Sequence, residues 1–278
     1  MNDQGLYAGK PHFDASIIGF ALLFALGLAV LALSGDWHGG FIAAQAASTV
    51  LPGWLWECLT TLGDGRVQMA LMLPFCLRYP RVFWALLLGA LIAGAMSRGL
   101  KVWLPMPRPA VVLDASQITI IGARLTSHSF PSGHTVSAFS FVVAWIALLG
   151  WWRALPIVFI ATLAAFSRIA VGAHWPVDVL AGGVIGVAGG WLGLRLSQRF
   201  RWGLGIRGHW TLIAIAVIAV ATLPFDGQGY PDTLPWRIVA CLWGLGGFVV
   251  VYLRPLLRDG WQAANRPLAG LLGKDSTS

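Results

Sequence analysis

Charged residues are scarce in this chain. Asp, Glu, Lys and Arg make up 11% of its 278 residues, and only 11 residues are acidic. Soluble domains carry about 25% charged residues. Hydrophobic residues reach 57%, so the composition excludes an ordinary soluble domain and predicts an integral membrane protein. The net charge of +8 does not indicate a nucleic acid partner, because the Lys and Arg residues of a membrane protein collect in its cytoplasmic loops.

Cysteine is also rare. The three residues, Cys58, Cys76 and Cys241, show no C-x-x-C spacing. We expect them to be small buried side chains rather than a disulfide or metal site. No cluster of acidic residues indicates a metal, and we expect no cofactor. The chain has no internal repeat of fixed period and no low-complexity segment.

Long apolar runs are what the sequence has in abundance, and they predict an all-α fold, a polytopic membrane helix bundle. We expect a single domain, 1–278: N-terminal spans and interfacial helices in 1–81, a six-helix core whose motifs lie in 82–194, and two extra C-terminal spans in 208–254. The expected spans are residues 17–33, 67–77, 82–96, 135–150, 154–166, 179–194, 210–223 and 236–253.

Three further segments carry local signals. The first span is longer than the apolar core of a signal peptide, so we expect an uncleaved anchor. Residues 41–62 are interrupted by Pro52-Gly53 and predict one or two short interfacial helices. The loop 110–130 follows three prolines and is long enough to cover a site as a lid.

The positive charges predict the orientation of the bundle. With both termini in the cytoplasm, twelve Lys and Arg residues face the cytoplasm and seven lie on the other side. This bias agrees with about eight spans and both ends inside. We expect a multi-pass protein of the bacterial inner (plasma) membrane. Five of the seven exceptions lie between Arg98 and Arg168, which indicates that they serve a site facing the periplasm or cell exterior.

Two histidines flank the fourth and fifth spans, so the chain enters the membrane and returns with both on one side. His174 and Asp178 are four residues apart, which predicts that they share one face of a helix. A carboxylate at that distance can fix the imidazole tautomer and prepare a nucleophile or base. The alternative is a structural pair at a helix start.

His134 follows Pro131-Ser132-Gly133 at the entrance of the fourth span. A helix start presents unbonded N–H groups and the positive end of the helix dipole, which suit an anion. Gly133 allows a ligand to approach the backbone closely, and Ser132 can add a hydroxyl donor. A plain serine cap beside an interfacial histidine is the alternative.

Three cations complete the set: Lys101, Arg108 and Arg168. An arginine fork matches phosphate oxygens, and a lysine adds a point charge. Each of them alone is better explained as an interfacial residue that keeps its charge in water. Three cations, two histidines, a carboxylate and a helix start on one membrane face together favour phosphoryl transfer.

The motifs Lys101-x6-Arg108-Pro109, Pro131-Ser132-Gly133-His134 and Ser167-Arg168-x5-His174-x3-Asp178 resemble the three-part signature of the type 2 phosphatidic acid phosphatase superfamily. That group includes membrane lipid phosphatases and the soluble vanadium haloperoxidases. The resemblance covers residues 82–194.

The resemblance implies a role for each matching residue. His174 would attack phosphorus and form a phosphohistidine, Asp178 would orient it, and His134 would protonate the leaving oxygen. The substrate phosphate would be bound by Lys101, Arg108, Ser132, Gly133 and Arg168. The family needs no metal.

The expected function is therefore hydrolysis of a lipid-linked phosphate or diphosphate, of the undecaprenyl diphosphate, phosphatidic acid or phosphatidylglycerol phosphate class. A lipid phosphotransferase, a lipid A phosphatase and a non-catalytic transporter or scaffold stay open, whereas the membrane spans count against a haloperoxidase. The expected partners are the bilayer and a membrane lipid, with no nucleic acid and an undetermined oligomeric state. We expect His128, Arg124 and Asp114 to be loop residues, and Asp64 with Arg66 to form a turn.

Overall fold

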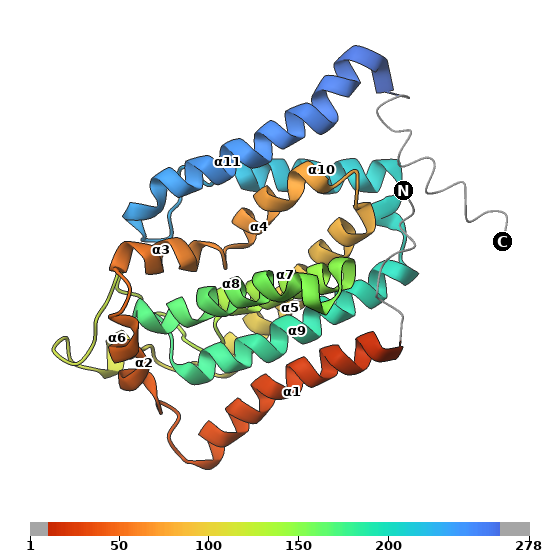
Figure 1. The fold of residues 1–278 in the computed structure, drawn as a ribbon. Coiled ribbons are helices and arrows are strands. Elements are labelled where there is room, and N and C mark those ends of the chain that lie inside the picture. Colours follow the sequence, from red (N-terminus) through yellow and green to blue (C-terminus); the bar gives the residue numbers. More distant parts are fainter. Residues whose placement is uncertain (1–10, 262–278) are drawn as a thin grey trace.

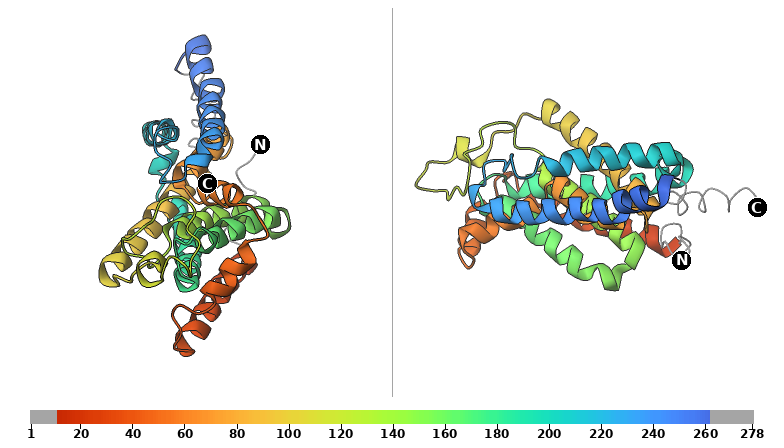
Figure 2. Two further views of the ribbon diagram at one scale, coloured as in Figure 1. Left: turned by 90° about the vertical axis from the view of Figure 1, so that its left-hand side faces the viewer. Right: turned by 90° about the horizontal axis from the view of Figure 1, so that it is seen from above.

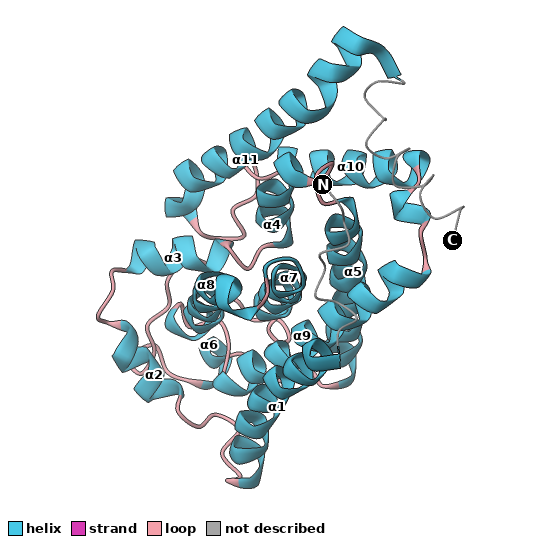
Figure 3. Ribbon diagram, turned by 45° about the vertical axis from the view of Figure 1, so that its right-hand side comes forward, coloured by secondary structure: helices cyan, strands magenta, loops and turns pink. Residues whose placement is uncertain are grey.

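The computed structural model describes residues 11–261. Every regular element in this part of the chain is helical (Figure 3). Five helices are long and apolar enough to cross a membrane. The prediction of an all-α, polytopic membrane helix bundle is confirmed.

The long helices are α1 (Pro11–Leu33), α5 (Pro80–Trp103), α8 (Trp151–Ala170), α9 (Pro176–Arg199) and α11 (Leu234–Phe248), which continues as a π-helix over Val249–Leu253. Two shorter apolar helices are α7 (Gly133–Leu149) and α10 (Ile206–Ala221). The short helices are α2 (Phe41–Ser48), α3 (Gly53–Thr61), α4 (Gly65–Met72) and α6 (Pro109–Val112). Figure 1 shows α1 and α11 flanking a central group of helices on opposite sides, and the left view of Figure 2 agrees.

The second predicted span, 67–77, is wrong as a continuous helix. α4 has only eight residues, and Pro74 lies in a 3₁₀ turn directly after it, because proline lacks the N–H that would continue the α-helical ladder. The chain still travels between the two ends of the bundle here. Gly63, just before α4, packs against His134, whereas Trp84 of α5 donates to the Phe200 carbonyl beyond the far end of α9.

The predicted spans 135–150 and 154–166 leave Trp151–Arg153 as the turn between them, and this turn is also displaced. These residues already belong to α8, and the turn is made by Gly150, whose φ is +76°. A left-handed φ costs glycine little, since it has no Cβ to collide with the backbone. The short helices expected within 41–62 are present as α2 and α3.

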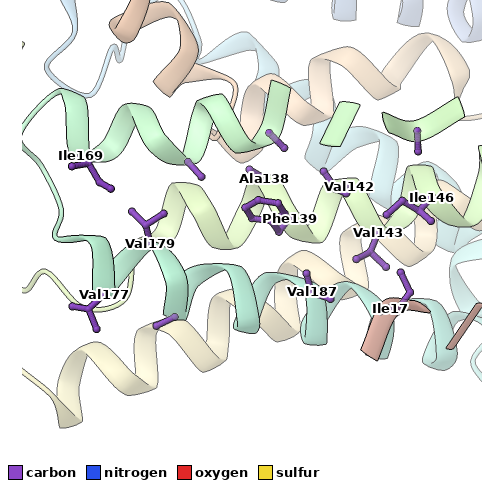
Figure 4. Close-up of a cluster of buried hydrophobic side chains, with 14 of the residues drawn as sticks. Ile17, Ala138, Phe139, Val142, Val143, Ile146, Ile169, Val177, Val179 and Val187 are labelled. Carbon is purple, nitrogen blue, oxygen red and sulfur yellow. The ribbon is translucent and has the colours of Figure 1, made fainter. Parts of the chain in front are cut away.

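The core of the bundle is formed by α7 packed between α8 and α9, with α5 beside it (Figure 4). Phe139, Val142 and Ile146 of α7 are fully buried there. The glycines of α9 bring the helices close together: a Cβ added at Gly190 would lie 2.9 Å from the Ser140 carbonyl oxygen of α7. Small residues at such contacts let helix backbones approach in a membrane, where lipid tails compete for apolar side chains.

The connecting loops on the left of Figure 1 gather at one end of the bundle, with α2, α3 and α6. The 110–130 loop begins with α6 and is otherwise irregular. Its Ile121 N–H donates to the Val171 carbonyl (3.2 Å), and its Ala123 N–H donates to the Gly229 carbonyl (2.9 Å). The loop is therefore tied both to the connection between α8 and α9 and to the connection between α10 and α11. Its role as a lid stays a prediction.

Candidate active site

His174 lies in the connection between α8 and α9, not on a helix, so the helical face predicted for His174 and Asp178 is wrong. Pro176 takes the first position of α9, and Trp175 is its N-cap, because proline suits a helix start. The two side chains nevertheless meet, with 3.1 Å between His174 Nδ1 and Asp178 Oδ2. Asp178, third in the helix, points back toward the helix start and accepts the Trp175 N–H at 2.9 Å.

Asp178 Oδ2 gathers three donors. Besides His174 and the Trp175 N–H, it accepts a short hydrogen bond from the Ser129 hydroxyl. The carboxylate is fully buried, so this network fixes it. The His174 proton therefore sits on Nδ1, and the lone pair of the ring is on Nε2. No motif in the sequence singles out Ser129, which is one serine among several in a polar loop.

Arg108 lies over the other ring nitrogen. Its Nη1 is 3.2 Å from His174 Nε2 and donates to the Ala173 carbonyl at 2.7 Å, while its Nε donates to the Ser127 carbonyl at 2.9 Å. A phosphate placed before Nε2 would thus be within reach of the guanidinium. Burial, followed by the charges of Arg108, Arg168 and Lys101, holds the pKa of His174 well below its ordinary 6.5. The ring is therefore neutral at pH 7.

Two more cations surround the pair. Arg168, in the last turn of α8 and 2% exposed, donates to Thr60 Oγ1 at 2.5 Å and to the Tyr230 hydroxyl at 2.8 Å. Lys101, in the last turn of α5, donates to the carbonyls of His128 (3.1 Å) and Ser129 (3.2 Å).

Burial and the neighbouring Arg168 lower the pKa of Arg108 to about 10, so its guanidinium is still charged at pH 7. These three positive charges surround one carboxylate, Asp178, whereas the nearby Asp64 is paired with Arg66. This surplus of positive charge suits a phosphate dianion.

His134 is the second residue of α7, which begins at Gly133 after the N-cap Ser132. No side chain caps the helix start, and the space beside Gly133 is open. The Ser132 hydroxyl accepts a hydrogen bond from Thr135 Oγ1 at 2.9 Å and is fully buried. The helix start predicted from the sequence is therefore present, with the Gly133 side of it accessible.

A cavity of about 510 Å³ opens at this helix start. It is lined by Gly63, Asp64, Gly65, Gly94, Ser97, Arg98, Lys101, Gly133, His134, Val136, Ser137 and Gln228. Of the eight residues predicted to form the site, three line this cavity. The other five are not among its lining residues and are all buried, His174 being 2% exposed.

Several residues at the site were not recognised in the sequence. Asp64 forms the expected turn, accepting the Arg66 N–H at 2.9 Å, but it also lines the cavity. Thr60 and Tyr230 hold Arg168, and Gln228 lines the cavity beside His134. The glycines on both sides of Gln228 were the one available sign of an unusual turn. Of the expected loop charges, Arg124 donates to the Ala110 carbonyl at 2.5 Å.

Residues 82–202 match the family model of the PAP2 superfamily. This segment of the chain, called the PAP2 segment below, is similar to the PAP2 superfamily. The PAP2 segment contains every residue predicted to form the site, from Lys101 to Asp178. Thr60, Asp64, Gln228 and Tyr230 lie outside it.

Proteins similar to this chain include "Undecaprenyl-diphosphatase BcrC" of Bacillus subtilis (strain 168), 37% identical over 98 residues, which are 34% of this chain and 47% of the relative. "Lipid A 4'-phosphatase" of Bacteroides thetaiotaomicron is 36% identical over 72 residues, 26% of this chain and 32% of the relative. The chain thus spans less than half the length of each. The crystal structure of Aquifex aeolicus LpxE aligns with a TM-score of 0.48 and 26% identity, covering 51% of this chain and 85% of LpxE.

Proposed function

We propose that this protein is an integral membrane phosphatase that hydrolyses a lipid-linked phosphate or diphosphate through a phosphohistidine on His174. The observation that carries the proposal is the arrangement around the imidazole. Asp178 holds Nδ1 at 3.1 Å, and Arg108 Nη1 lies 3.2 Å from Nε2. A neutral, oriented imidazole facing a surplus of positive charge matches the requirements of a nucleophile that attacks an anionic phosphorus centre.

In the proposed mechanism, His174 Nε2 attacks phosphorus and the bond from phosphorus to the leaving oxygen breaks. His134 donates a proton to that oxygen. Water then attacks the phosphohistidine while His134 accepts its proton, so that inorganic phosphate leaves and both rings return to their starting state. Lys101, Arg108 and Arg168, with Ser132 and the Gly133 amide, would stabilise the charge on the phosphate oxygens.

The substrate class follows from the position of the site at the end of a membrane bundle. The membrane-spanning helices favour a phosphate carried by a lipid over a soluble one. The names of the relatives support the undecaprenyl diphosphate class first, with lipid A phosphates, phosphatidic acid and phosphatidylglycerol phosphate as further candidates.

We further propose that the site faces the periplasm or cell exterior. Seven Lys and Arg residues were predicted to lie on the non-cytoplasmic side, and two of them have roles inside the fold. Arg66 pairs with Asp64 at 2.6 Å, and Arg237 donates to the Leu223 carbonyl at 2.7 Å. Three others, Lys101, Arg108 and Arg168, surround His174. Their positions therefore do not argue against an exterior location for this end of the bundle.

The test is phosphate release by the purified protein from a panel of these lipids, with His174→Ala as the control for contaminating phosphatase. We expect release from at least one lipid by the parent protein and none by the variant. Repeating the assay with an acceptor lipid distinguishes hydrolysis from phosphotransfer, because transfer would yield a phosphorylated acceptor in place of free phosphate. Binding of the lipids without any turnover would overturn the proposal in favour of a non-catalytic role.

A further inference from the structure

The loop between α10 and α11 lies outside the PAP2 segment but reaches the candidate active site. Figure 1 shows this hairpin with its loop at the same end as α3. Gln228, in this loop, has a φ of +52°, and no other non-glycine residue in the described range 11–261 has a positive φ. A left-handed backbone is costly for a residue with a side chain, and such residues gather at functional sites.

Gln228 lies beside the proposed proton donor. Its side chain lines the same cavity as His134 and interacts with the His134 ring, and its Nε2 donates to Asp64 Oδ2 at 3.1 Å. Asp64 is itself paired with Arg66 at 2.6 Å. Because the amide nitrogen of Gln228 is directed to a carboxylate, the amide oxygen is left to accept the ring N–H of His134.

The loop around Gln228 is fixed on several sides. The Gln228 N–H donates to Asp226 Oδ1 at 2.9 Å, and the Gly229 carbonyl accepts the Ala123 N–H at 2.9 Å. The hydroxyl of Tyr230, two residues after Gln228, accepts a hydrogen bond from Arg168 at 2.8 Å. This loop is therefore held against both the 110–130 loop and Arg168, and the unusual backbone at Gln228 is maintained by its surroundings.

We propose that Gln228 is a positioning residue for His134, and that the α10–α11 hairpin is a working part of the active site. The proposal rests on the proposed function, in which His134 protonates the leaving oxygen. An imidazole has two nitrogens. If one ring N–H donates to Gln228 Oε1, the other nitrogen is directed into the cavity. In the imidazolium form, which the bound phosphate anion would stabilise, this second nitrogen gives its proton to the leaving oxygen, and the N–H facing Gln228 stays in place. Without Gln228, the ring can rotate and the proton to be transferred is no longer directed to the substrate.

Leaving groups provide the test. A nitrophenolate leaves phosphorus without needing a proton, whereas an alkoxide needs one. We would measure kcat/KM of the parent protein and of Gln228→Leu on p-nitrophenyl phosphate and on dodecyl phosphate. This constant reports phosphohistidine formation and not the later hydrolysis step. General acid catalysis contributes about 10²–10⁴-fold. We expect a loss of about 10–100-fold on dodecyl phosphate and less than about threefold on the nitrophenyl ester.

Two further variants separate positioning from folding. Gln117→Leu is the matched control, because Gln117 is an exposed residue of the 110–130 loop whose side chain accepts only a local N–H, that of Asp114. It should retain parent activity on both substrates. In a His134→Ala background, Gln228→Leu should add no further loss, since residues that act as one unit are not additive. Equal losses on the two substrates, no loss on either, or full additivity would overturn the proposal.

A readout that needs no turnover keeps this inference separate from the proposed function. The ¹⁵N imidazole resonance of His134, assigned by its disappearance in His134→Ala, should shift in Gln228→Leu and stay in place in Gln117→Leu. An unchanged resonance in Gln228→Leu would overturn the positioning role even in a fully active enzyme. Failure of the parent protein to release phosphate from any substrate would instead overturn the proposed function, while a shifted resonance would still support the Gln228 contact.

Discussion

Replacing Arg108 by glutamine should move the acid limb of the pH–rate profile to higher pH. The nucleophile must be unprotonated, and the pKa of His174 lies well below 6.5 because the ring is buried and three cations are nearby. Arg108 is the first of these cations, with 3.2 Å between its Nη1 and His174 Nε2. Arg108→Gln removes one positive charge, which makes the imidazolium less unfavourable. The pKa of His174 should then rise, and the ring should become protonated at a higher pH.

The size of the shift follows from Coulomb's law. Two unit charges about 4 Å apart interact by about 4 kcal/mol at an effective dielectric constant of about 20, which corresponds to about three pKa units. Neighbouring charges shift pKa values by about 1–3 units in measured cases. Burial, the largest cause, and the charges of Arg168 and Lys101 remain in the variant. We therefore expect the acid limb to move upward by about 1–3 pH units. The pKa of His174 should still stay below that of an exposed histidine paired with a carboxylate.

The assay is kcat/KM against pH for the parent protein and Arg108→Gln on one lipid substrate, so that ionisation of the substrate is common to both. Loss of a phosphate contact will also lower the whole profile, by about 10²–10³-fold, but that loss does not change the position of the limb. Arg124→Gln removes a charge that contacts the Ala110 carbonyl in a loop and should leave the limb in place. An unmoved limb in Arg108→Gln would refute the assignment of His174 as the group that must be neutral.

The remaining predictions concern the nucleophile, the metal and the topology. His174→Ala should abolish turnover while preserving folding, and Asp178→Asn should impair turnover, both measured by phosphate release. Activity of His174→Ala within about tenfold of the parent, roughly 1.4 kcal/mol, would contradict the assignment of His174 as the nucleophile. Turnover should survive EDTA and be inhibited by vanadate, which can adopt the five-coordinate shape of the transition state; strict dependence on magnesium would contradict this. A membrane-impermeant maleimide should label Ser116→Cys in intact cells and Gln198→Cys only after the membrane is opened, and the reverse pattern would overturn the orientation.

The helices and the main motifs could be predicted from the sequence because their causes are local. An apolar run long enough to cross a bilayer must form a helix, since only a helix satisfies its own backbone hydrogen bonds in lipid. The start of α7 at Gly133 is likewise set by neighbouring residues. The misjudged elements were local too: Pro74 ends the helical path after α4, and Pro176 starts α9 after His174. Both signals were present in the sequence but carried less weight than the apolar pattern.

Only the tertiary structure decided how the site is completed. Ser129 reaches Asp178, Tyr230 reaches Arg168, and Gln228 reaches His134 from segments far away in the chain. No periodicity connects such residues, because their contacts depend on how helices and loops pack after each has formed. A polar residue in a loop has the same appearance in the sequence whether it faces water or a buried cation. The sequence therefore determined the chemistry of the site, and the packing of the 110–130 loop and the α10–α11 hairpin determined which additional residues hold it in place.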